Sequence, residues 1–576
     1  MLQKSIEKLK KMPGFIWWLA GLTAACAAGV VLAYYWRVFY YLDARGFSPL
    51  LVTGGVCAFA AAIYLLVSAV CRFIKDFDRR AALCILLCGG LFVFSNPPLQ
   101  TPDEQSHYLR AFAVSMGRFD FDAARGYPES VDRLIAAFPG AWVNAHTSAG
   151  VRGDADASEE DAAAAQHSAP ILQQGQDTYP VQPGYEVYDS AGFALKQYGE
   201  NGTVSGVADG FAQYAAGAAA PAVTEPLLLS ILQYLPAAMF MAAARLVGLQ
   251  ALGCLYAGRL ANLLVYTLLC YFALKGCRRY KPVLLAAMLL PISLYMAGSL
   301  NYDAILLGCY YFAASYYCRD KLADRDLAGY AVVFWIMNTI KPWINLLWLA
   351  LPLVLPKTAW KSRMKKWQFA VLCVLPALLM TRLVSWYGAT FIANYGEIGR
   401  MLPDVDQIPQ LKFILSNPLR YIAVMLGTLY ENSFFVGQLG VFGAMDLPIE
   451  AVNGLSLCML VFGAALSVHE KSSLRAVPAA GLGGLAVVYA AGVMTAMYIT
   501  YTPVGMVRII GLQPRYFLPV FLMLAILLAA LLSHLLEPRQ SGKKPLQVAL
   551  GSFGVCGVLG AVLLFQHYFV GPVYTI

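Results

Sequence analysis

Long apolar runs separated by short charged segments dominate the chain. A helix needs about 20 apolar residues to cross the hydrocarbon core of a bilayer, and runs of about this length recur along the sequence. The pattern predicts an all-α polytopic membrane protein with about 13 transmembrane helices. The predicted crossings lie near 13–36, 49–71, 81–96, 251–274, 282–299, 302–318, 327–341, 343–356, 367–386, 449–467, 475–500, 516–536 and 546–568.

The positions of the basic residues predict the orientation, because cytoplasmic loops of membrane proteins are rich in Lys and Arg. The basic segment 4–11 places the N-terminus in the cytoplasm, and the basic segment 72–80 returns to that side. The first apolar run ends in aromatic interface anchors at 34–36 rather than in a small-residue cleavage site, so we expect a retained span and not a cleaved signal peptide. Counting onward places the C-terminus outside the cell.

Two apolar stretches are not expected to cross. The basic cluster 275–281 lies inside only if the stretch 226–247 stays on the outer face and 251–274 alone crosses. The same count leaves 417–435 outside. We therefore expect 226–247 to form a helix that lies on, or dips into, the outer face, and 417–435 to remain outside without crossing.

Composition excludes a soluble protein. Of the 576 residues, 59% are hydrophobic and 13% charged, and the mean hydropathy is +0.60. The net charge is +9, but the basic residues are dispersed between apolar runs, so no nucleic-acid partner is predicted. The 13 cysteines are mostly scattered singly in apolar runs without a CxxC pattern, which is typical of buried packing residues.

The chain divides into four regions. Two extra N-terminal spans fill 1–80, and a core follows over 81–386 with a long extracytoplasmic segment at 98–226. Within that segment the mixed pattern of 103–143 predicts ordered structure, whereas 148–222 is rich in Ala, Gly, Ser, Asp and Gln and predicts a variable insert. A second extracytoplasmic region covers 387–448, and C-terminal spans fill 449–576.

A polar stretch directly after the third predicted span carries the main candidate site. Residues 95–110 read SNPPLQTPDEQSHYLR, and the three prolines forbid continued helix, so Asp103 and Glu104 follow a stiff exit loop at the outer membrane face. Glu104 and His107 have helical spacing, as do Asp103, His107 and Arg110. Ionisable groups gathered at a membrane boundary indicate a functional site.

Further polar residues fall at the same predicted depth. They are Asn301, Tyr302 and Asp303 in an outer turn, Lys341 near the end of a short hairpin, the loop 431–446, and Arg508, Gln513, Arg515 and Tyr516 before the next-to-last span. Cations at this depth suit a lipid phosphate, and arginine matches its oxygens in pairs. A carboxylate can take the proton of an acceptor hydroxyl. Together these parts describe sugar transfer from a polyprenyl-phosphate donor.

Each residue also has a structural interpretation. Arg515 could anchor its span at the interface, Lys341 could extend its amine toward water, and Asp303 or Asp103 could cap a helix. His107 could be an ordinary loop residue, and Arg110 could pair with a neighbouring carboxylate. The combination of these residues at one depth is more specific than any one of them.

Four segments together resemble the bacterial domain of unknown function 2142 family. They read PPLQTPDEQSHYLRAF (97–112), SLNYDAILLG (299–308), GQLGVFGAMDLP (437–448) and GLQPRYFLP (511–519), and the resemblance covers about 80–540. The family looks like a branch of the GT-C superfamily of membrane glycosyltransferases. Two departures are the pair of extra N-terminal spans and the insert at 148–222.

The resemblance implies a GT-C-like fold with a large first extracytoplasmic catalytic loop and juxtamembrane helices, one of them at 226–247. It implies a bacterial cytoplasmic membrane location and a catalytic role for Asp103, supported by Glu104. Donor phosphate would fall to Arg515, Lys341, Arg508 and Arg110, with His107, Asn301, Tyr302, Asp303, Gln513 and Tyr516 around the pocket.

The expected function is therefore a glycosyltransferase that moves a sugar from a polyprenyl-phosphate donor to a cell-envelope glycan or lipid-linked acceptor. A divalent cation, Mg²⁺ or Mn²⁺, could bind Asp103, Glu104 and Asp303, because these are hard oxygen donors. A flippase or transporter and a non-catalytic assembly subunit are the alternatives. Sugar, acceptor, stereochemistry and oligomeric state cannot be deduced from the sequence.

Overall fold

The computed structural model describes residues 49–118, 126–138, 207–217, 219–220, 222–223, 231–395, 405–443, 447–469, 476–535, 544–566 and 568. The first predicted span and nearly all of the proposed insert lie outside this part of the chain. Apart from one short two-stranded sheet, the described elements are helical.

The helices fall into three groups along the chain. The first group is α3 (Pro49–Arg72), α4 (Phe77–Ser95), α5 (Glu104–Ser115), α6 (Glu129–Ala137), α9 (Val207–Ala216), η1 (Leu232–Tyr234) and α10 (Leu235–Leu246). The second is α11 (Ala251–Gly276), α12 (Lys281–Met288), α13 (Pro291–Ala297), α14 (Asp303–Ala314), η2 (Ser315–Cys318), α15 (Asp324–Ile340), η3 (Ile344–Leu349), α16 (Ala350–Val354) and α17 (Lys366–Tyr395). The third is α18 (Gln407–Ser416), α19 (Pro418–Glu431), η4 (Ser433–Gln438), α20 (Glu450–Leu466), η5 (Ser467–His469), α21 (Ala476–Thr500), η6 (Pro514–Phe517), α22 (Leu518–Leu535) and α23 (Lys544–Phe565). Strands β1 (Val441–Phe442) and β2 (Leu447–Pro448) pair antiparallel.

Six described helices are long and apolar enough to cross a membrane: Thr53–Arg72, Ala251–Gly276, Lys366–Leu383, Pro478–Thr500, Pro514–His534 and Pro545–Phe565. Each coincides with a predicted span. The other predicted spans correspond to shorter or more charged helices where they are described, so the count of about 13 stays a prediction. The predicted span 282–299, for example, is two short helices, α12 and α13, because Leu290 before Pro291 is extended.

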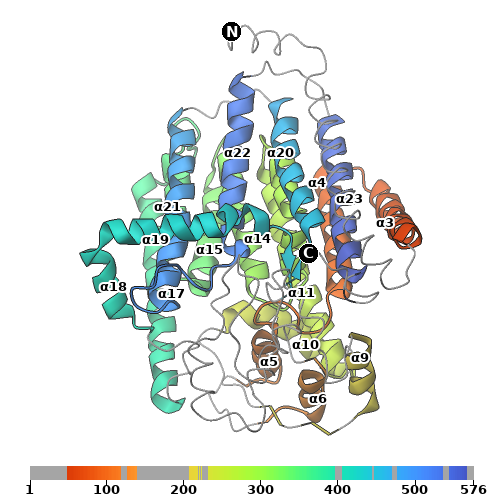
Figure 1. The fold of residues 1–576 in the computed structure, drawn as a ribbon. Coiled ribbons are helices and arrows are strands. Elements are labelled where there is room, and N and C mark those ends of the chain that lie inside the picture. Colours follow the sequence, from red (N-terminus) through yellow and green to blue (C-terminus); the bar gives the residue numbers. More distant parts are fainter. Residues whose placement is uncertain are drawn as a thin grey trace.

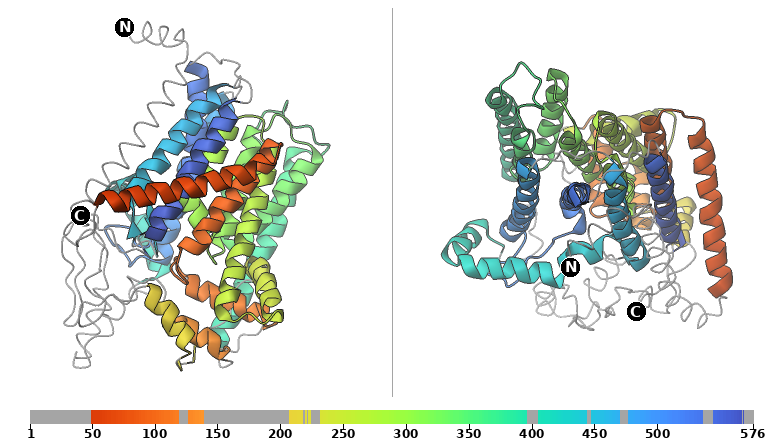
Figure 2. Two further views of the ribbon diagram at one scale, coloured as in Figure 1. Left: turned by 90° about the vertical axis from the view of Figure 1, so that its right-hand side faces the viewer. Right: turned by 90° about the horizontal axis from the view of Figure 1, so that it is seen from above.

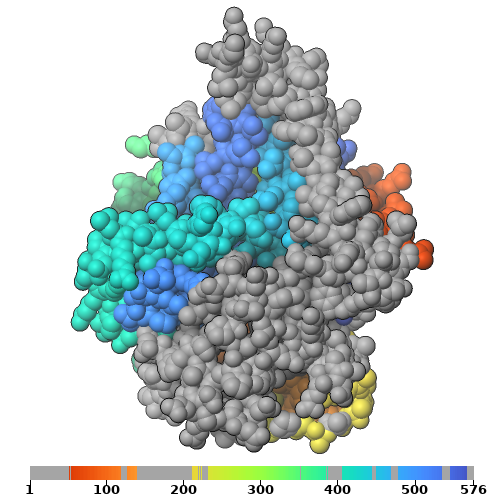
Figure 3. Space-filling model, in the orientation of Figure 1, coloured from red at the N-terminus to blue at the C-terminus, as the bar shows by residue number. Residues whose placement is uncertain are grey.

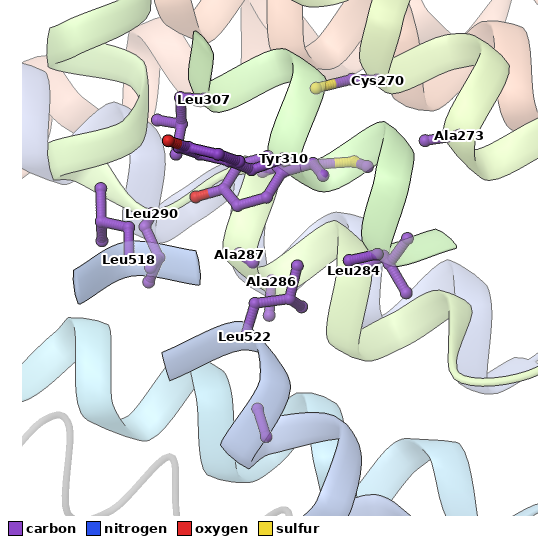
Figure 4. Packing of buried hydrophobic residues seen from close by; sticks show 14 of the residues in the cluster. Cys270, Ala273, Leu284, Ala286, Ala287, Leu290, Leu307, Tyr310, Leu518 and Leu522 are labelled. Atoms are coloured by element: carbon purple, nitrogen blue, oxygen red, sulfur yellow. The ribbon is translucent and has the colours of Figure 1, made fainter. Parts of the chain in front are cut away.

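The long helices stand side by side and form one core (Figures 1 and 2). α11 packs against both α4 and α14, and α23 packs against α4 and α20. Figure 4 shows the interior where α11, α12, α14 and α22 meet, with Cys270, Leu284, Tyr310 and Leu522 among the buried side chains. Burial of these apolar groups against one another gives the bundle its rigidity.

A second, smaller core lies at one end of the bundle, where α5, α6, α9 and α10 gather (Figure 1). α10 has 12 residues, about 18 Å, which is too short to cross a bilayer, and it packs on α5 and α11. α9 lies inside the predicted insert and packs Phe211 against Phe138 at 5.0 Å. This smaller core includes Leu99 of the exit loop (residues 96–103), so these helices pack directly against that loop.

α18 and α19 lie across the bundle rather than along it, and Figure 3 shows them as a band over one face. α19 has 14 residues, and it exposes Leu419, Ile422, Leu426 and Tyr430 at helical spacing. An exposed apolar stripe on a short transverse helix is typical of a helix lying in the membrane interface.

Candidate functional site

Asp103 stands at the end of the exit loop with its side chain turned outward. Asn96, Pro97 and Pro98 end α4, and Asp103 occupies the N-cap position of α5 with left-handed backbone (φ 59°, ψ 12°). Its carboxylate makes no capping hydrogen bond, and 62% of the side chain is exposed. The capping interpretation therefore does not describe this carboxylate.

Glu104, the next residue, has the opposite environment. Its side chain is fully buried and forms a bidentate ion pair with Arg259, with Nε–Oε1 at 2.8 Å and Nη2–Oε2 at 2.6 Å. The Leu300 amide also donates to Oε1. Both carboxylate oxygens of Glu104 are thus engaged inside the protein, whereas the Asp103 side chain is exposed.

The exit loop is also tied to the outer turn 299–303. Asn301 donates from Nδ2 to the Pro102 carbonyl at 2.9 Å, and its Oδ1 accepts from the Asp303 amide at 2.8 Å. Asn262 of α11 donates to the carbonyls of Ser299 and Asn301. Asn301 therefore joins two loops that are about 200 residues apart in sequence.

Four charged side chains from distant parts of the chain meet at this place. Asp303 binds Lys341 (Oδ1–Nζ 2.8 Å) and lies 2.8 Å from Arg515 (Oδ2–Nε). Arg515 Nη2 lies 3.6 Å from Asp103 Oδ2. The Lys341 ammonium also lies over the rings of Tyr516 and Tyr302, at 4.5 and 5.4 Å from their centroids. The four charges therefore alternate in sign in the order Lys341, Asp303, Arg515 and Asp103.

Arg515 retains hydrogen-bonding capacity. Its side chain is 5% exposed, and among the described residues its Nη1 has no hydrogen-bond partner. A buried guanidinium nitrogen without an acceptor is costly, because the group gives up water without replacing it. An anion bound beside Arg515 would supply that acceptor.

A pocket with a volume of about 140 Å³ lies beside the cluster. Asp303, Lys341 and Arg515 line its charged end. The remaining lining is Met296, Leu306, Leu307, Tyr310, Ile344, Tyr489, Val493, Ala496, Met497, Tyr516 and Leu518. Most of these residues are apolar, and the hydroxyls of Tyr310 and Tyr489 bond each other at 2.9 Å. Much of the wall is therefore apolar. The pocket thus suits an anionic head joined to an apolar chain.

His107 is buried behind this cluster rather than exposed in a loop. Its Nδ1 shares a 2.6 Å hydrogen bond with the Tyr234 hydroxyl, and its ring meets Tyr302 edge-on at 4.8 Å. Burial, followed by the charge of Arg110, lowers the pKa of His107 to about 3. Burial raises the pKa of Tyr234. Both groups are therefore neutral at physiological pH, and the His107 ring packs against Tyr302.

Two predicted cations lie apart from the four-residue cluster. Arg508 pairs with Glu431 at 3.6 Å and is not part of the pocket lining. The positive charge of Arg110 lowers the pKa of His107 and opposes the rise that burial causes in the pKa of Tyr234.

Gln513 lies two residues before Arg515, and its Oε1 is buried with no hydrogen-bond partner in the described part of the chain. Gln513 is not among the residues that line the pocket.

Most of the strained backbone positions lie in or next to the loops that carry these residues. Among the described residues, the non-glycine positions with φ between 48° and 68° are Leu99, Asp103, Tyr280, Trp343 and the run 433–435, and Tyr280 lies apart, at the N-cap of α12. Such positions cost on the order of 1–3 kcal/mol each and persist where the surroundings enforce them. Phe435, for example, is stacked at 4.2 Å on Phe517, two residues after Arg515. The site is thus built on preorganised loops.

The carboxylates do not fit a metal site. Glu104 is bonded to Arg259, and Asp303 to Lys341 and Arg515, so only Asp103 faces outward. No group of three or more His, Cys, Asp or Glu side chains in the described segments is placed to hold a metal ion. We derive no step through a metal.

Arg259 is the residue that sequence reasoning missed. It is a lone charge in the middle of the apolar helix α11. An ionisable residue within a membrane span is costly and normally has a dedicated partner, so its position was an available signal. That Glu104 is this partner cannot be deduced from the sequence, because the two residues are 155 positions apart.

Comparison with known proteins gives one family. Residues 214–524, more than half of the chain, match the family described as Predicted membrane protein (DUF2142). A stretch of 122 residues is 30% identical to the transcription regulatory protein OpdE of Pseudomonas aeruginosa, covering 20% of this chain and 28% of that protein. The chain thus spans under a third of that relative. No solved structure matches. Asp303, Lys341 and Arg515 lie within the matched region, and the chain belongs to the DUF2142 family of membrane proteins.

Proposed function

We propose that this protein is a GT-C-type glycosyltransferase that moves a sugar from a polyprenyl-phosphate donor to a glycan or lipid-linked acceptor on the extracytoplasmic face. The observation that carries the proposal is the buried Nη1 of Arg515, which has no hydrogen-bond partner among the residues that the structure describes; Arg515 lies between the Asp103 carboxylate and a largely apolar pocket. A site for a lipid phosphate needs a cation, an apolar chain path and an adjacent base, and all three lie together.

Each charged group of the cluster has a separate role in the proposed reaction. Asp103 accepts the proton of the acceptor hydroxyl, whose oxygen forms a bond to the anomeric carbon of the sugar. The bond from that carbon to the phosphate oxygen breaks, and the electron pair leaves with the polyprenyl phosphate. Arg515 and Lys341 stabilise the developing phosphate charge. Asp303 holds both cations in place before the donor arrives.

The lining of the pocket supports a lipid donor. Leu306, Leu307 and Val493 line it together with the charged residues, so apolar groups next to the phosphate would leave water as the phosphate reaches Arg515. Burial of apolar surface contributes roughly 25 cal/mol per Å². A water-soluble nucleotide sugar would not use this surface.

A transporter is the second candidate, because an ionisable residue inside a membrane span often marks a transport path. Arg259 is such a residue. However, it is 0% exposed and its five donor hydrogens have five acceptors, so it has no group to offer a moving substrate. This arrangement supports the enzyme over the transporter.

The test is incubation of the purified full-length protein in vesicles with a panel of radiolabelled polyprenyl-phosphate sugars and candidate acceptors. The native protein and Glu129→Gln, which changes an exposed carboxylate of α6, should release polyprenyl phosphate and labelled product. Asp103→Asn should not. Equal product formation by the native protein and Asp103→Asn would contradict the proposed role of Asp103. Lipid movement across the vesicle without a new covalent product would favour transport.

A further inference from the structure

We propose that Arg259 is a positioning residue that fixes Asp103 relative to Arg515 by holding the exit loop from behind. The proposal rests on the function proposed above for its catalytic half. Arg259 contacts neither the pocket nor the four-residue cluster. Its effect therefore reaches the site through the backbone on either side of Asp103.

Arg259 donates all five of its guanidinium hydrogen bonds to the exit loop and to the residues on either side of it. Nη1 donates to the carbonyls of Val93 (3.0 Å) and Asn96 (2.7 Å), and Nη2 donates to that of Pro97 (2.8 Å). Nε and Nη2 also donate to the two oxygens of Glu104. These bonds join the end of α4, the loop and the start of α5 to one rigid fork, because a guanidinium is planar.

Such anchoring is needed because the loop cannot hold itself. α4 ends at Ser95 with its last carbonyls exposed to the loop, and the prolines at 97 and 98 have no N–H to bond them. Two of the carbonyls that Arg259 binds, those of Asn96 and Pro97, belong to this stretch. The N–H that Pro97 lacks would have bonded the Val93 carbonyl four residues before it, and Arg259 Nη1 binds this carbonyl instead. Arg259 thus replaces a backbone donor that a proline removes and also binds two carbonyls of the loop.

Asp103 is fixed by its two neighbours rather than by its own side chain. Glu104 is held by Arg259 and the Leu300 amide, and the Pro102 carbonyl is held by Asn301. Between these two fixed points Asp103 adopts left-handed backbone and makes no side-chain capping bond. Its carboxylate is thereby directed toward Arg515 without any local bond that a substrate would have to break.

The first measurement is hydrogen exchange, which does not depend on activity. In Arg259→Lys, whose ammonium has three donors in place of five, we expect amides of 97–107 to exchange about tenfold faster than in the native protein. The control is Arg319→Lys, another buried arginine, paired with Asp326 away from the exit loop, which should leave 97–107 unchanged. Native-like exchange in Arg259→Lys would overturn the proposal.

The second measurement separates positioning from structural support. With the best donor found for the native protein, Arg259→Lys should lower kcat about tenfold and leave donor KM within about twofold, because the phosphate site is untouched. A raised KM with unchanged kcat, or no change in either, would overturn the catalytic half. If the native protein transfers no sugar, the proposed function fails, and the exchange result alone decides whether Arg259 holds the loop.

Discussion

Two polar clusters lie on opposite sides of the exit loop, and they differ in how completely their hydrogen bonds are made. Behind the loop, Arg259 and Glu104 are fully buried and every donor of the guanidinium has an acceptor. In front of it, the Nη1 of Arg515 has no partner within the described segments, and the Asp103 carboxylate is exposed. The completed cluster holds the backbone, and the incomplete one is equipped to bind a ligand.

The largest expected effect is on catalysis in the front cluster. Asp103→Asn removes the base without changing side-chain size, and we expect the transfer rate to fall by about 10²–10⁴, the usual contribution of general base catalysis. The unfolding temperature in detergent should change little, because the carboxylate makes no capping hydrogen bond and its 3.6 Å ion pair with Arg515 is exposed on the Asp103 side. A rate within about threefold of native would contradict a role as base.

The opposite pattern is expected behind the loop. Glu104→Gln leaves Arg259 as a buried charge without a counter-ion, which should lower the free energy of unfolding by about 3–5 kcal/mol. Thermal unfolding monitored by circular dichroism measures this loss. Asp103→Asn, one residue away, is the matched control. Equal stability of the two variants would show that the burial of Glu104 carries no energetic weight.

Arg515→Lys should have an intermediate effect. It keeps the charge that faces Asp303 but removes the planar fork, so the donor phosphate loses paired hydrogen bonds. We expect donor KM to rise about tenfold, because one charge-assisted hydrogen bond contributes about 1.5–3 kcal/mol. Arg508→Lys, in the pair with Glu431 outside the pocket lining, should leave KM unchanged. Equal changes in donor KM for Arg515→Lys and Arg508→Lys would mean that the donor phosphate does not bind at Arg515.

A smaller effect is expected from filling the pocket. Leu307→Trp would occupy part of the roughly 140 Å³ cavity below the cations and should raise donor KM by several-fold, on the order of 1 kcal/mol. Val488→Trp, at a half-exposed position of α21 outside the pocket lining, is the control. Unchanged KM for Leu307→Trp would mean that the lipid chain does not enter.

The smallest effect near neutral pH comes from His107. Its pKa is about 3 in the folded protein, below the unfolded value of 6.5, so the unfolded chain binds the extra proton between these two values. Stability should therefore fall as pH drops from 6.5 toward 3, by at most about 1.4 kcal/mol per pH unit from this residue. His107→Gln should flatten this dependence. Identical pH profiles of unfolding would contradict it.

The sequence predicted part of this arrangement. The charge rule placed Asp103, Asp303, Lys341 and Arg515 at one membrane face, and the structure brings these four side chains together. It could not predict that Asp103 and Glu104 have opposite environments, because adjacent residues leave a helix start in different directions and only the fold decides which meets α11. The sequence also predicted Arg508 at this membrane depth, but in the structure Arg508 pairs with Glu431 of α19 and does not join these four side chains.

The most direct test of the central claim is the affinity of the native protein for polyprenyl phosphate compared with the uncharged polyprenol of equal length. If the unpaired donor of Arg515 receives the phosphate, the phosphate should bind at least about tenfold more tightly, corresponding to one charge-assisted hydrogen bond of about 1.5–3 kcal/mol. The preference should disappear in Arg515→Gln. Equal affinity of the native protein for the two lipids would contradict the account.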